Sequence, residues 1–194
     1  VALITAAAFP KRIKAFIAFD SFLGWRVNGI EIGLEIETCF ETEMKNRSRS
    51  TRQFASFEEA VNHSVSHPWF PKTRETARNI VERHVKKLAN GRWAFTHDAR
   101  TYGQRQLLYV SEEQRIDLCR RVACPVLLIE ASRPRSESSQ AYFDQYVHLR
   151  LKAIRDFSAT KVDGNHHVHS DSPQQVAAAI MQWWNRRFRH QAKL

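Results

Sequence analysis

The chain has 194 residues, of which 43% are hydrophobic, so it is long and apolar enough to fold around a buried core and is not a disordered polypeptide. Its net charge of +10 permits an anionic partner, but the basic residues lie in scattered runs without interleaved aromatic side chains, so we expect no nucleic-acid partner. No apolar run is long enough to span a membrane, and three scattered cysteines exclude a disulfide framework and suit the cytoplasm, where we expect the protein.

A helix and then a strand are predicted at the start of the chain. Residues 1–9 are rich in Ala, Leu, Ile and Val, which predicts a buried helix, and residues 13–19 form an apolar run flanked by charge, which predicts a buried strand that closes at Asp20. The helical pattern starts at Val1 with no capping residue before it. We therefore expect a truncated chain.

The sequence predicts mainly helices in the middle of the chain. Ser56, followed three residues later by Glu59, predicts a helix that begins with a capping box. Residues 72–88 have the spacing of a charged amphipathic helix that ends at residues 90–91, Asn-Gly. A further helix is expected over residues 111–121. This composition indicates a mainly helical insertion between two strand regions.

Strands and helices alternate in the last third of the chain. Residues 124–131 are a short continuous apolar run, as expected of a buried parallel strand, and residues 157–162 form the next strand. Between them, residues 139–154 predict a helix with Leu149 among its inward side chains, and residues 174–188 predict the final helix.

The predicted strands 13–19, 126–130 and 157–162 are separated by helices. Such connections are right-handed crossovers that favour parallel pairing. The sequence therefore predicts an α/β fold with a three-stranded parallel sheet.

A polar turn over residues 162–173 joins the last strand to the last helix, at the sheet edge where α/β folds place chemistry. It contains three histidines: His166, His167 and His169. Two interpretations of this turn are possible: one histidine is a catalytic base, or the histidines form a metal cluster that includes Asp171. No second ligand group has zinc spacing, so we expect no metal and no cofactor. His166 lies at the turn itself, two residues after Gly164, and is the candidate base.

The order of these elements resembles the C-terminal half of the α/β-hydrolase family, and is closest to serine-hydrolase-like proteins. The segments that carry the resemblance are residues 9–13, 56–60, 96–100, 124–129 and 164–173. The resemblance implies a partial hydrolase core over residues 1–23 and 122–194, with a helical lid over residues 24–121. It also implies a small-molecule, ester-like substrate and His166 as the base.

The chain departs from the family pattern at the nucleophile and at the acid. The family's nucleophile lies in a Gly-x-Ser-x-Gly motif, which does not occur in these 194 residues. We therefore expect no nucleophile in this chain and no activity of the chain alone. Two carboxylates are candidates for the acid, Glu137 after the strand 124–130 and Asp20 after the earlier strand, and the sequence does not separate them.

The alternative function is that of a non-enzymatic binding module whose basic surface meets an anionic partner. The scattered positive charge is the feature that favours it. The sequence makes no prediction about the oligomeric state.

Overall fold

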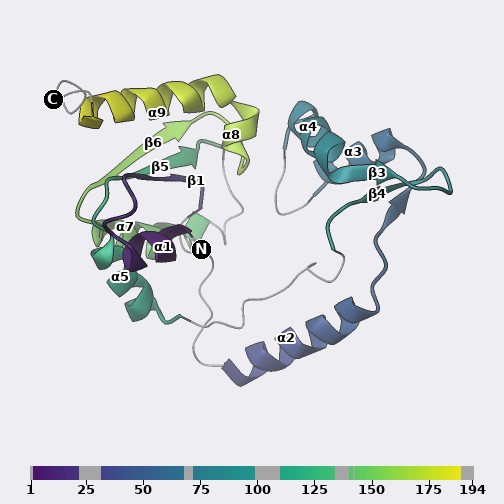
Figure 1. Cartoon of the computed structure of the whole chain (residues 1–194), viewed down its shortest axis with the longest axis horizontal. Coiled ribbons are helices and arrows are strands. Elements are labelled where there is room, and N and C mark those ends of the chain that lie inside the picture. The colour runs from purple at the N-terminus through teal and green to yellow at the C-terminus, as the bar shows by residue number, and fades with distance from the viewer. Residues whose placement is uncertain are drawn as a thin grey trace. The chain divides into compact units, whose positions relative to one another are not determined.

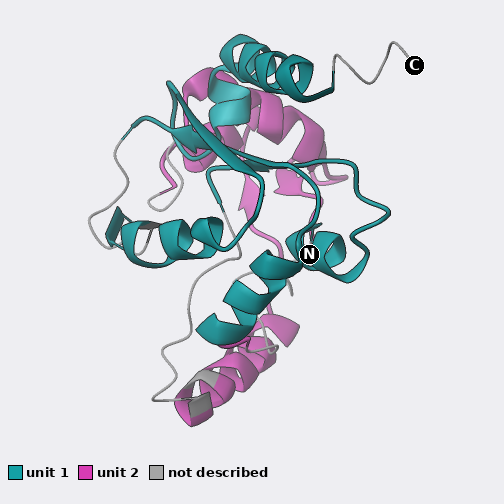
Figure 2. Cartoon of the chain, turned by 90° about the vertical axis from the view of Figure 1, so that its left-hand side faces the viewer, with its two compact units in different colours: residues 1–25, 112–194 teal, residues 26–111 magenta. Residues whose placement is uncertain are grey.

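The computed structural model describes residues 2–21, 32–67, 72–98, 110–133, 140–141 and 143–188. The chain divides into two compact units (Figure 2). Unit 1 comprises residues 1–25 and 112–194, and unit 2 comprises residues 26–111. Each unit has its own sheet and its own hydrophobic core.

A three-stranded parallel sheet lies at the centre of unit 1. Its strands are β1 (Phe16–Phe19), β5 (Val126–Ala131) and β6 (Phe157–Val162), in the order β1-β5-β6. Val126 pairs with Phe16 on one side and with Phe157 on the other, and both pairings are parallel. The predicted α/β fold with a parallel sheet is confirmed, although β1 begins three residues later than the predicted strand.

Helices cover both faces of this sheet (Figure 1). Successive side chains of a strand point to opposite faces, so β5 contributes Val126 and Leu128 to one core and Leu127, Ile129 and Ala131 to the other. The helices that build the first core are α1 (Ala2–Ala8), α5 (Glu112–Arg121) and α7 (His148–Lys152).

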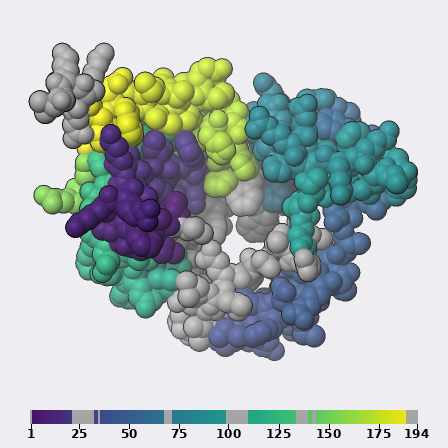
Figure 3. Space-filling view, viewed as in Figure 1, coloured from purple at the N-terminus to yellow at the C-terminus, as the bar shows by residue number. Residues whose placement is uncertain are grey.

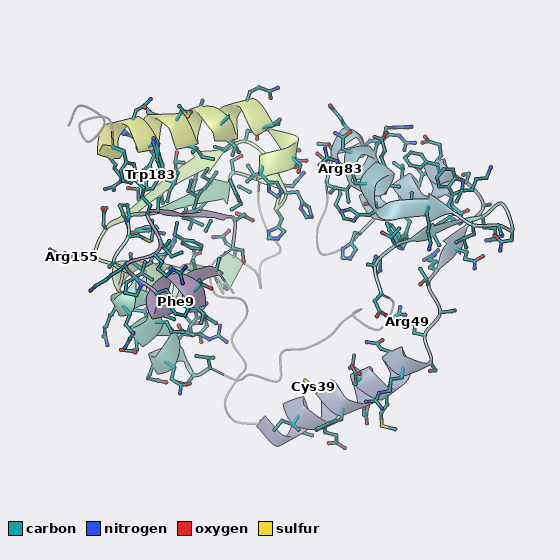
Figure 4. The ribbon with its side chains drawn as sticks, viewed as in Figure 1. Phe9, Cys39, Arg49, Arg83, Arg155 and Trp183 are labelled. Atoms are coloured by element: carbon teal, nitrogen blue, oxygen red, sulfur yellow. The ribbon has the colours of Figure 1, made fainter. Side chains whose placement is uncertain are left out.

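The second core lies under α8 (Val168–Asp171) and α9 (Pro173–Phe188). Trp183 (Figure 4) is the largest buried side chain that α9 contributes. The opposite side of α9 lies on the surface, where its atoms are yellow-green in Figure 3 and where Met181 is exposed. The amphipathic helix predicted over residues 174–188 is thus confirmed, with Pro173 as its first residue.

One prediction about an inward-facing residue is wrong. Leu149 was expected to point inward, but it is 48% exposed, whereas Arg150 is fully buried. A π-helix over Phe143–Val147 precedes α7, and its wider turn shifts the inward face by one residue relative to a regular α-helix. Arg150 donates two hydrogen bonds of 2.7 Å to the carboxylate of Glu112, which makes its burial possible.

Unit 2 is mainly helical in its described residues. Its helices are α2 (Ile32–Arg47), α3 (Phe57–Val65) and α4 (Arg74–His84). Ser56 caps α3 as predicted, because its hydroxyl accepts a hydrogen bond of 3.1 Å from the N–H of Glu59. The carboxylate of Glu59 reaches back to the N–H of Ala55, one residue before the position expected in a regular capping box.

Unit 2 also contains a small antiparallel sheet that the sequence did not predict. Its strands are β2 (Gln53–Phe54), β3 (Val85–Lys87) and β4 (Trp93–Phe95), in the order β2-β4-β3. The helix predicted over residues 72–88 therefore ends at His84. Residues 90–91 lie in the turn between β3 and β4, where the Gly91 N–H donates to the carbonyl of Leu88 at 2.9 Å and Gly91 has a φ of +79°. The Asn-Gly pair therefore marks a hairpin and not a helix end.

No helix of the described residues is long and apolar enough to cross a membrane. All three cysteines are reduced and buried.

Candidate active site

Asp20 lies directly after β1, at the carboxyl end of the parallel sheet. Its φ of +44° is uncommon for a residue with a side chain, although Asp adopts this region more readily than most. The Asp20 N–H donates to the carbonyl of Ile129 at 2.8 Å, and Asp20 Oδ1 accepts a hydrogen bond of 2.8 Å from the N–H of Ala131. The neighbouring strand thus fixes a buried carboxylate at the sheet edge.

The second oxygen of Asp20 meets the ring of His166. Asp20 Oδ2 lies 3.0 Å from His166 Nδ1, although the two residues are 146 positions apart in the chain. An ionised carboxylate only accepts hydrogen bonds, so we infer that His166 Nδ1 carries the hydrogen. The carboxylate side chain is 1% exposed and the imidazole 34% exposed. The pair therefore has one end buried in the protein and the other end open to solvent.

The sheet order explains how these two residues meet. Asp20 follows β1 and His166 follows β6, and these strands lie on either side of β5. In parallel strands the carboxyl ends share one edge, so both residues leave the sheet at that edge. Asp20 spans the end of the central strand through its bond to Ala131, and reaches the loop that follows β6.

A glycine and a carboxylate shape the loop that carries His166. Gly164 has a φ of +154°, and a Cβ atom there would lie 3.2 Å from Val168 Cγ2 and 3.3 Å from Asp171 Cβ. The N–H of Asn165 donates to Asp171 Oδ2 at 3.0 Å. Asp171 therefore closes the loop between Gly164 and α8.

Ser132 and Arg133, which follow β5, also form hydrogen bonds with the start of this loop. The N–H of Ser132 donates to the carbonyl of Val162, and the N–H of Arg133 donates to the carbonyl of Gly164. The side chains of Ser132 and Arg133 also donate to the carboxylate of Asp163, and these hydrogen bonds lower the Asp163 pKa. Sequence reasoning missed this brace, because nothing in the local pattern pairs residues 132–133 with Asp163.

Two other histidines lie in the same segment as His166. His167 immediately precedes α8, and His169 lies within it, with its ring centroid 5.3 Å from that of Phe19. Within the described ranges, no group of three or more His, Cys, Asp or Glu side chains could hold a metal ion.

Solved structures with the same arrangement of elements identify the fold. A hypothetical protein from Pseudomonas aeruginosa PAO1 superposes with a TM-score of 0.79 at 20% identity, over 95% of this chain and 63% of that one. An α/β hydrolase from Novosphingobium aromaticivorans superposes with a TM-score of 0.55 at 16% identity, over 95% of this chain and 61% of that one. The chain has the α/β-hydrolase fold.

Two further comparisons show other proteins to which this chain is similar. The thioesterase domain from the curacin biosynthetic pathway superposes with a TM-score of 0.66 at 16% identity, over 93% of this chain and 62% of that one. A curated relative, "serine hydrolase-like protein" of Danio rerio, is 23% identical over 188 residues. That alignment covers 93% of this chain and 56% of the relative, so the chain spans little more than half the length of the protein it matches. No protein-family model matches the chain.

Of the three residues predicted for the site of this α/β-hydrolase fold, the structure brings two together. His166 and Asp20 form the pair described above. Glu137, the other candidate acid, lies outside the described residues. The positive φ and deep burial of Asp20 are structural signals that the sequence alone could not supply.

Proposed function

We propose that Asp20 and His166 are the acid and the base of a hydrolase active site. The observation that carries this proposal is the 3.0 Å contact between His166 Nδ1 and a buried carboxylate whose other oxygen is fixed by the Ala131 N–H. This arrangement sets the ring orientation and favours one tautomer, as the acid of a hydrolytic triad does. The hydrolase-like fold and the similarity to a thioesterase domain support the same reading.

In this proposal each group has a defined task. With the hydrogen on Nδ1, the lone pair of His166 Nε2 accepts the proton of a nucleophile and later returns it to the leaving group. Asp20 stabilises the imidazolium that forms between these two steps. Because the carboxylate is buried, its interaction with that positive charge is weakly screened by water.

The nucleophile is proposed to come from a part of the whole protein that lies outside these 194 residues. The family's Gly-x-Ser-x-Gly motif is absent from this sequence, and the chain matches little more than half of its curated relative. We propose that residues 24–121, which include the whole of unit 2, form the lid. The substrate proposed for the whole protein is a small molecule with an ester or related bond. A cytoplasmic location remains part of the proposal, and three reduced, buried cysteines fit it.

The experiment that tests the proposal compares the three histidines of one loop in the full-length protein. Hydrolysis of activated esters is measured for His166→Ala, His167→Ala and His169→Ala. We expect His166→Ala to lose several orders of magnitude in kcat/KM and the other two to keep most of the activity. Loss of activity in His167→Ala or His169→Ala with retention in His166→Ala would refute the assignment. The 194-residue chain alone is expected to be inactive.

A further inference from the structure

A pocket in unit 2 concentrates positive charge, and the proposed hydrolysis does not use it. Its volume is about 260 Å³, and it is formed by the segment before β2, by α3 and by the segments that flank α4 and β4. Six basic side chains line it: Arg49, Arg52, Lys72, His63, His67 and His97. Arg49 is labelled in Figure 4. All of these described lining residues belong to unit 2.

The pocket has no acidic side chain among its described lining residues. The two carboxylates of α3, Glu58 and Glu59, do not line the pocket and form hydrogen bonds with other groups. Glu58 is bound by the guanidinium groups of Arg74 and Arg78, and Glu59 accepts a hydrogen bond from the N–H of Ala55. The lining of the pocket therefore carries an excess of positive charge.

The pKa values of two imidazoles in the lining are lowered, first by burial and then by neighbouring positive charges. The pKa of His63 is lowered mainly by burial and then by the charge of Arg52, and only Glu59 opposes the shift. The pKa of His67 is lowered by burial and by Lys72. A bound anion would offset both electrostatic contributions.

The basic groups are also held in position. The Lys72 ammonium donates to the carbonyl of Ser64 at 3.0 Å, and the Arg52 guanidinium lies 5.4 Å from the ring centroid of Phe54. The His63 ring packs against Phe54, and Phe95 lies between His63 and His97 in a chain of ring contacts. Because these contacts already restrain Arg52, Lys72, His63 and His97, these side chains would lose less conformational entropy when a ligand binds.

The hydroxyl groups of Ser50, Thr51 and Ser64 add hydrogen-bond donors to the lining. Three permanent cations suit a ligand with more than one negative charge, and phosphate oxygens accept hydrogen bonds from guanidinium, ammonium and hydroxyl groups. The volume of about 260 Å³ is slightly below the range of about 300–1,000 Å³ that is usual for drug-sized ligands. It therefore fits a compact ligand better than an extended polyanion.

We propose that this basic pocket of unit 2 binds a small molecule that carries a phosphate group. The phosphate lies among Arg49, Arg52 and Lys72, with the three imidazoles at its periphery. The proposal does not depend on the hydrolytic site of unit 1, because no residue of that site belongs to the pocket.

The test is a titration of the 194-residue chain with inorganic phosphate and with glycerol phosphate at constant ionic strength, followed by the NMR signals of the imidazole C–H groups. We expect saturable shifts at His63, His67 and His97. The signals of His84, His148 and His169 serve as internal controls, because these residues do not line the pocket. Equal shifts at all histidines, or no saturable shift at the three pocket residues with either probe, would overturn the proposal.

Two single-charge variants separate a specific site from general attraction. Arg52 is exposed, so Arg52→Ala should fold normally, and we expect it to weaken phosphate binding about tenfold. Arg83→Ala is the matched control, because Arg83 is an exposed arginine of the same unit that does not line the pocket (Figure 4), and it should bind phosphate as the wild type does. Arg52→Lys should recover part of the affinity. Equal weakening in Arg52→Ala and Arg83→Ala, with far-UV spectra unchanged, would assign the binding to net charge and not to the pocket.

Discussion

The two units of this chain use charge in opposite ways. In unit 1 two ion pairs each have one fully buried partner: Asp20 pairs with His166, and Arg150 pairs with Glu112. In unit 2 the cations that line the pocket are partly or fully exposed, and the described lining contains six basic side chains and no acidic one. A buried, paired charge fixes geometry, because leaving either partner alone is costly. An exposed cluster of one sign instead creates a potential for a ligand to neutralise.

The largest expected effect is at the buried pair of unit 1. In the full-length protein, Asp20→Asn should lower kcat/KM for ester hydrolysis by about 10³–10⁴-fold, because the amide no longer stabilises the imidazolium. Glu137→Gln is the matched variant at the other candidate acid and should keep most of the activity. If Glu137→Gln is the inactive variant instead, Asp20 is a structural residue.

The buried arginine of unit 1 should matter for stability. Arg150→Met leaves the Glu112 carboxylate without the two hydrogen bonds it accepts from Arg150, and should lower the free energy of unfolding by about 3–5 kcal/mol. Adding Glu112→Leu to this variant should recover much of the loss. Arg155→Met, at an exposed position (Figure 4), should change the free energy of unfolding by less than about 0.5 kcal/mol. Denaturant unfolding measures all three, and similar losses for Arg150→Met and Arg155→Met would contradict the contrast between buried and exposed charge.

Two glycines, one in each unit, allow the cost of an added Cβ at a crowded position to be compared with its cost at an open one. Gly164→Ala adds a Cβ within 3.2–3.3 Å of Val168 and Asp171 at a φ of +154°, so it should cost about 2–3 kcal/mol and displace His166. Gly91→Ala has a φ of +79° but no atom within 4 Å of the new Cβ, so its cost should be limited to about 1 kcal/mol of backbone strain. Thermal unfolding distinguishes the two. Equal losses would show that crowding around Gly164 is not what requires a glycine there.

The smallest expected effect is the pH dependence of anion binding in unit 2. The charged and titratable groups that face His63 and His67 are Arg49, Arg52, Glu59, Lys72 and His97. The pKa values of both imidazoles are lowered from 6.5, so both are neutral at pH 7, and a bound anion favours their protonated form. Binding therefore takes up protons, and the affinity should rise as the pH falls below about 6.5, by at most about tenfold per pH unit for each proton taken up.

Sulfate is the suitable probe for this measurement, because it stays doubly charged over the whole range. Calorimetric titration at several pH values gives the affinity. An affinity that is constant or falls with decreasing pH would show that His63 and His67 do not contribute to the site.

Local patterns determined much of the fold. The apolar run of β5, the capping serine of α3 and the amphipathic spacing of α9 are properties of short segments, and each was predicted from the residues alone. The turn with Gly164 and His166 was also predicted, because a glycine followed by polar residues at a strand end has a local physical cause. In each of these cases the neighbouring residues in the sequence are sufficient to predict the local structure.

Contacts between distant parts of the chain determined the features that local sequence patterns did not predict. The sequence named Asp20 and Glu137 as candidate acids and did not separate them, and Glu137 lies outside the described residues. The order β1-β5-β6 brings the Asp20 carboxylate to 3.0 Å from the ring of His166, which lies 146 positions away. Residues 85–87 continue a helical pattern in the sequence, yet they form β3 because pairing with β4 satisfies their backbone. Leu149 and Arg150 exchange their expected environments because a π-helix and the partner Glu112 lie outside the local pattern. Such outcomes depend on pairings across long stretches of chain, which no short segment of sequence encodes.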